Sequence, residues 1–263
     1  MGTYLDDIVS WHRARASNDR RPWRERAETV RYEGPSMLDA LSSSTGFVKV
    51  IAEVKRRSPS KGWIDENLDP GKLAHEYEEG GACAISVLTD EPHFSGAVTD
   101  LLEVRAAVNL PILRKDFTVS ANDVLDVAEM GASTVLLIAA ALEGDEMARF
   151  LRLAHHCGLD ALVEVHDHDE AQRAVDLGAR LIGVNQRDLR TFEVNSRHAA
   201  SVISSLPSSV VTVAESGMIS TDDVKVAASA GFDAVLVGET FVRSSHRRET
   251  VRAFASIVKD PRG

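Results

Sequence analysis

Residues 131–138 read GASTVLLI, a glycine followed by an apolar run, and this pattern recurs along the chain. The other copies are GACAISVL (81–88), GLDALVEV (158–165), GARLIGVN (178–185) and GFDAVLVG (231–238). Segments with helical periodicity precede these glycines. Glycine favours the left-handed conformation that ends many helices, and a short apolar run is typical of a strand buried on both faces. The repeat therefore predicts helices that alternate with parallel strands.

Three further apolar segments bring the number of predicted strands to eight. They are VKVIAEVK (48–55), LPILRK (110–115) and LPSSVVTVAES (206–216). Eight units across residues 48–263 average 27 residues each, which is the length of one strand plus one helix. The pattern predicts an α/β fold, a (β/α)8 TIM barrel that forms a catalytic domain over 48–263. A doubly wound open sheet is the alternative.

Residues 1–47 precede the first predicted strand and differ from the rest in character. Leu5, Ile8 and His12 fall at helical spacing, which predicts a helix. Seven arginines lie between residues 13 and 31. We expect a helical extension that packs on the barrel with its arginines in solvent. A role for these arginines in attracting an anionic substrate is the alternative.

Composition excludes several classes of protein. The 263 residues are 44% hydrophobic, enough for a core, and no apolar run has the length of a membrane helix or signal peptide. The net charge of −10 argues against nucleic acid as a partner. Cys83 and Cys157 lie in apolar or small-residue runs and predict a reducing compartment without disulfides. We therefore expect a cytoplasmic globular protein without nucleic-acid or membrane partners.

Polar side chains stand at the ends of the predicted strands, where active sites of barrels lie. They are Glu53, Lys55, Lys115, Glu164, Asn185, Glu215 and Ser216. A buried charge persists only when it is paired, so carboxylates and lysines that converge on one barrel mouth can satisfy one another. They can also tune each other's proton affinities, as acid–base catalysis requires. Salt bridges that close the upper layer of the barrel are the alternative.

Glycines follow the last two predicted strands. Gly217 follows Glu215 and Ser216, and Gly238 precedes Glu239 at the start of a short predicted helix. Glycines here let main-chain N–H groups approach a phosphoryl group. Ordinary turn glycines are the alternative.

Two histidines after the fifth predicted strand raise a different possibility. His166 and His168, together with Glu164, could bind the ion of a metal-dependent hydrolase. These residues also open a predicted helix, where aspartate and histidine are ordinary choices for the first turn. We therefore predict no metal site.

The motifs that carry these residues resemble the indole-3-glycerol phosphate synthase family. VIAEVKRRSPSKG (50–62) is closely similar to the family's signature. LTDEPHFSG (88–96), PILRKDF (111–117), IGVNQRDLRTFEV (182–194) and VAESGM (213–218) follow in the family's order. The resemblance spans the whole predicted barrel and implies a phosphosugar barrel with a helical extension.

The resemblance implies an activity. Family members are carboxy-lyases of tryptophan biosynthesis, which close 1-(o-carboxyphenylamino)-1-deoxyribulose 5-phosphate into an indole and release carbon dioxide and water. They use no metal or organic cofactor. By resemblance, Lys115 is the general acid that protonates the ketone oxygen, Glu164 moves protons during dehydration, and Lys55 holds the anthranilate carboxylate.

The other site residues are carried over by the same motifs. The resemblance implies a group that positions the sugar hydroxyls and the lysines, a phosphate cradle, and apolar walls with a polar support. The positioning group is Glu53, Asn185, Glu215 and Ser216. The phosphate cradle is Ser58, Gly217, Gly238 and the main chain of Glu239. The apolar walls are Pro59, Phe94 and Phe117, and the polar support is Arg187.

Electrostatics adds an expectation for the pKa of Lys115. Because Lys55 is a nearby cation, we expect it to lower the pKa of Lys115 toward working pH, against the opposing effect of Glu164.

The chain departs from the family at a few positions. Asn195 stands where the family commonly has aspartate, and Ala97 where it has a polar residue. Neither departure removes a proposed catalytic group.

Other functions remain open on sequence alone. A sugar-phosphate isomerase would keep the phosphate glycines without needing both lysines, and a non-catalytic barrel would tolerate loss of the strand-end charges. The expected partner is a small phosphorylated substrate. The sequence does not give the oligomeric state, and we favour a monomer.

Overall fold

The computed structural model describes residues 3–43, 46–58, 61–187 and 194–260. In this part of the chain, eight parallel strands form a closed barrel in the order β1-β10-β9-β8-β7-β6-β5-β4. The barrel strands are β1 (Lys49–Val54), β4 (Ala84–Leu88), β5 (Ile112–Lys115), β6 (Thr134–Ile138), β7 (Asp160–Val165), β8 (Leu181–Asn185), β9 (Val211–Glu215) and β10 (Ala234–Val237). The predicted (β/α)8 barrel is confirmed, and the open-sheet alternative is wrong.

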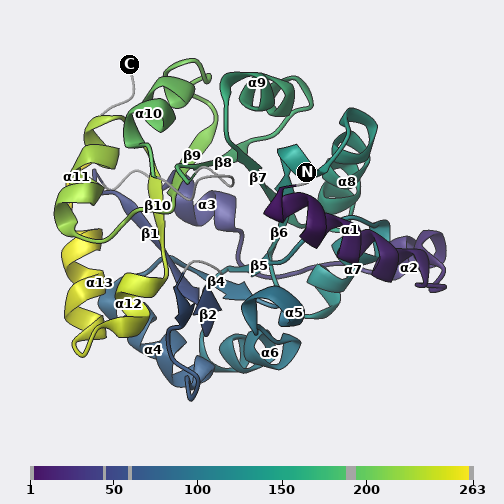
Figure 1. Ribbon diagram of the computed structural model, residues 1–263, viewed down its shortest axis with the longest axis horizontal. Helices are drawn as coiled ribbons and strands as arrows, with labels where there is room; N and C mark the ends of the chain where they lie inside the picture. Colours follow the sequence, from purple (N-terminus) through teal and green to yellow (C-terminus); the bar gives the residue numbers. More distant parts are fainter. Residues whose placement is uncertain (1–2, 44–45, 59–60, 188–193, 261–263) are drawn as a thin grey trace.

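Helices surround the barrel in the alternating order that the repeat predicts (Figure 1). The longer ones are α4 (Pro70–Gly80), α6 (Val98–Ala107), α7 (Ala121–Glu129), α8 (Gly144–His156), α9 (His168–Asp176), α10 (Ser196–Ser204), α11 (Thr221–Ser229) and α13 (Arg247–Ala255). Short elements sit in loops that follow strands: the hairpin β2 (Arg57–Ser58) and β3 (Gly62–Trp63), α5 (Glu91–Phe94), η1 (Ala139–Ala141) and α12 (Glu239–Arg243).

The repeated glycines act as the sequence predicts. Gly81, Gly131, Gly158, Gly178 and Gly231 all have positive φ, between 75° and 99°. Each therefore adopts the left-handed conformation that lets a helix end and the chain turn into the next strand.

Apolar side chains form two buried clusters. The larger lies between the strands and the surrounding helices, and the smaller fills the inside of the barrel. The inner cluster includes Ile51, Leu113 and Leu162 of the strands. These side chains fill the barrel interior, so we expect a ligand to bind at its rim.

Three helices precede the barrel: α1 (Tyr4–Ser17), α2 (Trp23–Thr29) and α3 (Met37–Ser42). Met37 and Leu41 of α3 are buried in the cluster inside the barrel. The Ser36 hydroxyl and the main-chain N–H of Leu38 donate to Asp160, the first residue of β7. Because β7 starts at Asp160, α3 closes the amino-terminal end of the barrel. The opposite end remains available for a site.

Arginines of the N-terminal segment bind the outer helices. Arg15 pairs with Asp123 at 2.8 Å, and both Arg21 and Arg26 pair with Asp126 at 2.7 Å. Five of the seven arginines are exposed, as expected, but the expectation missed these ion pairs with the barrel. Their carboxylate partners lie on α7, about a hundred residues further along the chain, so local sequence gives no sign of them.

None of the helices that the structure describes combines the length and the apolar character that a membrane crossing requires.

Candidate active site

A cavity of about 550 Å3 lies at the carboxyl ends of the barrel strands. Every predicted site residue that the structure describes is in its lining: Glu53, Lys55, Ser58, Phe94, Lys115, Phe117, Glu164, Asn185, Arg187, Glu215, Ser216, Gly217, Gly238 and Glu239. Pro59 lies outside the described residues. The parallel register explains the convergence, because all eight strands end at the same rim.

Lys115 lies between two carboxylates from other strands. Its Nζ is 3.0 Å from Oε2 of Glu164, at β7, and 3.4 Å from Oε2 of Glu215, at the end of β9. Both carboxylates are buried. Their charges therefore act on Lys115 with little screening by water.

The environment keeps Lys115 positively charged. Burial alone would lower the pKa of its ammonium group, but three carboxylates outweigh burial and raise the pKa above the ordinary value of lysine. They are Glu164, Glu215 and Glu53. The predicted lowering of the pKa by Lys55 is wrong. Lys55 is itself neutralised by Glu53, whose Oε2 lies 2.5 Å from Lys55 Nζ.

The two carboxyl groups beside Lys115 differ in pKa. Burial would raise the pKa of Glu164, but the charges of Lys115 and His166 overcome this and lower it. Burial also raises the pKa of Glu215, and the negative charge of Glu164 adds to the rise. One ammonium thus lies against two carboxyl groups, of which Glu164 has the lower pKa and Glu215 the higher.

Asn185 connects this cluster to the neighbouring loop. Its side-chain amide donates to Glu164 Oε1 at 3.1 Å, and its Oδ1 accepts from the Ser216 hydroxyl at 2.9 Å. The main-chain N–H of Arg187 also donates to that oxygen, at 3.1 Å. Asn185 therefore fixes the orientation of the Glu164 carboxylate relative to the loop after β9.

Two glycines make room for carboxylates that line the cavity. A Cβ on Gly183 would overlap Oε1 of Glu215, and a Cβ on Gly238 would overlap Oε2 of Glu53. Gly183 lies on β8 opposite Glu164 of β7. The absence of a side chain at both positions is thus part of how the strands present their carboxylates.

We expect Gly183→Ala to lower kcat at least about tenfold and the free energy of unfolding by about 1–3 kcal/mol, because the added methyl group displaces Glu215. Steady-state kinetics and urea unfolding measure the two effects. Gly144→Ala is the matched control, because a Cβ at Gly144 meets no atom within 4 Å. Wild-type kinetics in the Gly183→Ala protein would show that the position of Glu215 is not critical.

The opposite side of the cavity has the features expected for a phosphoryl group. Gly217 has a φ of 78°, and the Ser58 hydroxyl is buried without a hydrogen-bond partner in the described part of the chain. The Glu239 carboxylate is turned to cations: Lys61 Nζ lies 3.4 Å away and Arg243 donates from Nε at 3.0 Å. Sequence reasoning missed Lys61 and Arg243, although Lys61 belongs to the SPSKG run.

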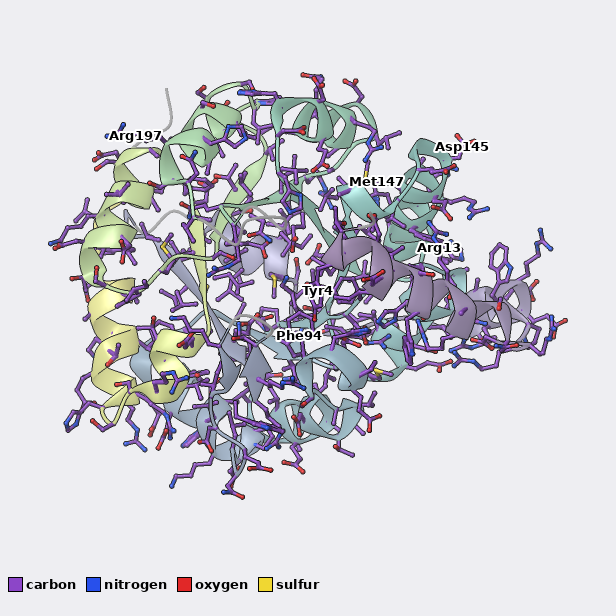
Figure 2. The ribbon with its side chains drawn as sticks, in the orientation of Figure 1. Tyr4, Arg13, Phe94, Asp145, Met147 and Arg197 are labelled. Carbon is purple, nitrogen blue, oxygen red and sulfur yellow. The ribbon has the colours of Figure 1, made fainter. Side chains whose placement is uncertain are left out.

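An apolar wall completes the cavity. The rings of Phe94 and Phe117 lie 6.2 Å apart. Tyr4, Leu5 and Ile8 of α1 line the same cavity, and Figure 2 shows Tyr4 and Phe94 in front of the barrel's centre. The sequence shows Leu5 and Ile8 as the apolar face of a helix, but helical spacing alone does not say what that face covers.

The rival sites do not form. His166 lies near Glu164 and Glu170, whereas His168 contacts Ser201 and Ser205. The hydrolase set of Glu164, His166 and His168 is not among the groupings of metal-binding side chains within the described residues. Both cysteines are free thiols in the structure.

Comparison with known proteins gives the family. The family model described as Indole-3-glycerol phosphate synthase matches residues 7–254. The chain belongs to the indole-3-glycerol phosphate synthase family. A relative of that name from Acetivibrio thermocellus is 39% identical, with 96% of this chain and 99% of the relative covered. Another from Kineococcus radiotolerans is 43% identical over 97% and 95% of the two chains.

Solved structures share the fold at low sequence identity. Thiamine phosphate pyrophosphorylase from Pyrococcus furiosus has a TM-score of 0.60 at 19% identity, covering 80% of this chain and 95% of that one. (S)-3-O-geranylgeranylglyceryl phosphate synthase from Thermoplasma acidophilum has a TM-score of 0.62 at 13% identity, covering 86% and 99%. Such likenesses concern the barrel alone. Family membership, by contrast, confirms the predicted synthase function over the isomerase, hydrolase and non-catalytic alternatives.

Proposed function

We propose that the cavity closes 1-(o-carboxyphenylamino)-1-deoxyribulose 5-phosphate to indole-3-glycerol phosphate, with Lys115 and Glu164 as the principal acid–base pair. The observation that carries the assignment is their 3.0 Å contact inside a cavity that also holds Lys55. Such a pair offers a proton donor and a proton acceptor to the same substrate.

Lys115 acts in ring closure. The ketone oxygen gains negative charge as the new carbon–carbon bond forms, and a nearby ammonium stabilises that charge. The raised pKa of Lys115 keeps the group protonated until the oxygen becomes basic enough to take the proton. Stabilisation of charge thus replaces the lowered pKa that the sequence led us to expect.

Lys55 and Glu164 serve the later steps. Lys55, held by Glu53, binds the anthranilate carboxylate and assists its departure as carbon dioxide. Glu164, ionised in this environment, exchanges protons with the intermediate during dehydration. Asn185 keeps the Glu164 carboxylate in place. Glu215 and Ser216 position the sugar hydroxyls and the lysine, and Arg187 supports Asn185 through its main chain.

Substrate binding uses the two ends of the cavity. The phosphoryl group lies against Ser58, Gly217, Gly238 and the main chain of Glu239. Lys61 and Arg243 are close enough to add positive charge on that side. The aromatic ring lies against Phe94 and Phe117. Anchoring both ends of the substrate reduces the entropic cost of bringing its reacting carbons together.

A turnover assay tests the proposal. Purified protein given the carboxyphenylamino substrate should develop indole fluorescence in buffer that contains a chelator, because Lys55, Lys115 and Glu164 carry the proposed steps without a metal. Product formation that depends strictly on an added divalent metal would contradict these assignments. Dialysed enzyme should also turn over without an added organic cofactor. The cytoplasmic location and the monomeric state stay predictions.

A further inference from the structure

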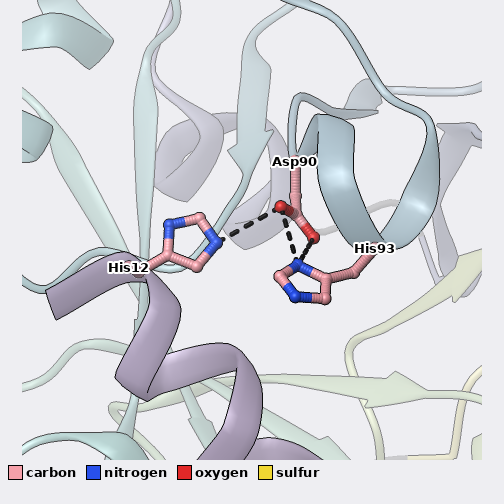
Figure 3. Close-up of side chains that lie close together, drawn as sticks. All are labelled: His12, Asp90 and His93. Carbon is pink, nitrogen blue, oxygen red and sulfur yellow. Dashed lines mark hydrogen bonds and ion pairs between the residues drawn. The ribbon is translucent and has the colours of Figure 1, made fainter. Parts of the chain in front are cut away.

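Three side chains from separate elements meet beside the active-site wall. His12 lies on α1, Asp90 lies between β4 and α5, and His93 lies on α5 (Figure 3). His12 Nε2 is 3.2 Å from Asp90 Oδ1, and His93 Nδ1 is 3.0 Å from Asp90 Oδ2. One ligand atom of each residue lies within 4.8 Å of the other two. Three donor atoms are therefore assembled around one point.

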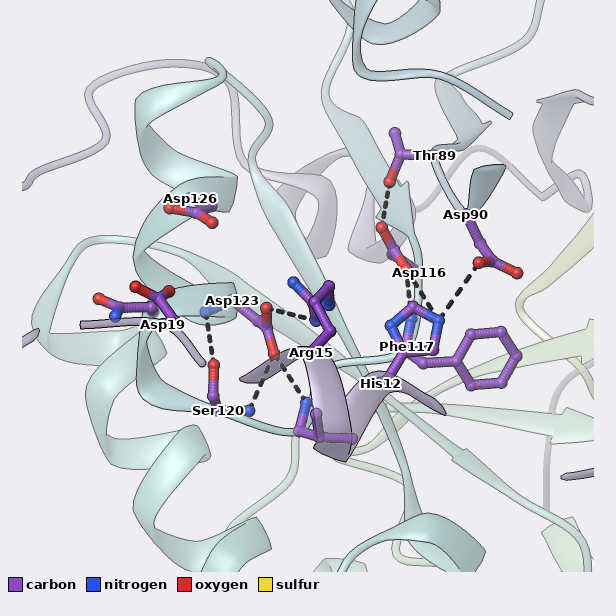
Figure 4. A network of polar contacts seen from close by, with 12 residues as sticks. His12, Arg15, Asp19, Thr89, Asp90, Asp116, Phe117, Ser120, Asp123 and Asp126 are labelled. Atoms are coloured by element: carbon purple, nitrogen blue, oxygen red, sulfur yellow. Dashed lines mark hydrogen bonds and ion pairs between the residues drawn. The ribbon is translucent and has the colours of Figure 1, made fainter. Parts of the chain in front are cut away.

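The charge balance of this cluster favours a cation. The Asp90 side chain is 0% exposed, and the ion-pair partners that the structure gives it among the described residues are the two imidazoles alone. Asp116 adds a second buried carboxylate, with Oδ1 4.0 Å from His12 Nε2 (Figure 4). Arg114 and Thr89 bind Asp116. A buried carboxylate without a firm positive partner is costly, and a bound cation removes that cost.

We propose that His12, Asp90 and His93 form a binding site for one divalent transition-metal ion, with Zn2+ as the representative. Two imidazole nitrogens and one carboxylate oxygen are ligands that such ions prefer over Mg2+ or Ca2+. The ion replaces the hydrogen bonds between the imidazoles and Asp90, because a ring nitrogen must carry no hydrogen to bind it. A fourth ligand position can be filled by water on the side of His93, whose side chain is 18% exposed.

The surroundings limit the affinity. His12 Nδ1 is buried and has no hydrogen-bond partner in the described structure. Metal-binding histidines usually donate from their second nitrogen to an acceptor, and loss of that acceptor weakens binding about 10–100-fold. We therefore infer an exchangeable ion that stabilises a contact, in contrast to a permanently bound structural ion.

The position of the site gives the ion its effect. The His12 ring lies 5.2 Å from the ring of Phe117, and Phe94 directly follows His93. An ion held by His12 and His93 ties α1 to α5 and so fixes both aromatic residues of the cavity wall. It contacts neither Lys115 nor Glu164, so the chemistry proceeds without it.

Metal binding to the full-length, untagged, chelator-treated protein tests the proposal. Equilibrium dialysis should give about one Zn2+ per chain, and Zn2+ should raise the thermal unfolding midpoint. His93→Gln should weaken binding by at least about tenfold. His75→Gln, which alters an exposed histidine paired with Glu79, is the matched control and should bind like wild type.

The fluorescence of Trp11 supplies a second measurement, which needs no substitution of a metal-binding residue. Its ring lies 4.9 Å from His12 and 5.8 Å from His93. Paramagnetic Co2+ should quench wild-type fluorescence, and Trp11→Phe should lose that quenching. Failure of the wild type to bind either ion would overturn the proposal and leave a hydrogen-bonded tie. Equal Zn2+ binding by His93→Gln would overturn it as well.

Discussion

Lys115→Ala is expected to lower kcat by about 10²-fold or more while KM stays nearly unchanged. The substitution removes both the proton donor and the positive charge that stabilises the ketone oxygen during ring closure. It leaves the phosphate side and the aromatic wall intact, so substrate binding should persist. Steady-state kinetics by indole fluorescence, with kcat and KM determined separately, measures the effect.

The loss of Lys115 must be separated from a loss of folding. Without this ammonium, the pKa of Glu164 is expected to rise, because the larger of the two positive charges that now oppose the effect of burial is gone. A thermal unfolding curve shows whether the variant is folded at the assay temperature. Lys225→Ala, at an exposed lysine on α11 that pairs with Asp222, is the matched control. A decrease in kcat of only a few fold would remove Lys115 from the role of general acid.

Glu164→Gln is expected to lower kcat by about 10²–10³-fold with little change in stability. Glutamine keeps the size of the side chain but cannot exchange protons during dehydration. The folded state should tolerate the change, because Glu215 can take over the ion pair with Lys115. The negative charge of Glu164 now raises the pKa of Glu215, so removing it lowers that pKa.

Kinetics and chemical unfolding of Glu164→Gln distinguish its chemical role from a structural one. Glu103→Gln, at an exposed glutamate on α6, is the matched control. Accumulation of a cyclised, undehydrated intermediate would place Glu164 in the second half of the reaction, as proposed. Full turnover by the variant would show that another group moves the protons, with Glu215 the nearest candidate.

Much of the fold follows from the sequence because local rules and the barrel agree. A glycine such as Gly131 ends a helix by its own conformational freedom, and the apolar run after it has one place to go. Parallel strands end at a common rim, so Lys115 and Glu164 could be predicted to meet although 49 residues separate them. These inferences need only the strand order, which the repeat supplies.

Other features depend on distances that no sequence pattern gives. The predicted effect of Lys55 on Lys115 failed because Glu53 neutralises Lys55, while three carboxylates surround Lys115. The cover that α1 provides over the cavity also depends on tertiary packing. His12 and Asp90 are 78 residues apart and belong to different elements, so their meeting could not be foreseen.

The helices before β1 act at both ends of the barrel. In Figure 1, α1 lies in front of the strands and α3 lies behind them. This N-terminal segment thus closes the amino-terminal end of the barrel with Met37 and lines part of the cavity at the carboxyl-terminal end with Tyr4. A chain shortened to 48–263 would therefore expose the apolar interior of the barrel at one end and lose part of the cavity wall at the other. Natural sequence variation in this N-terminal segment should consequently change thermal stability and substrate affinity together.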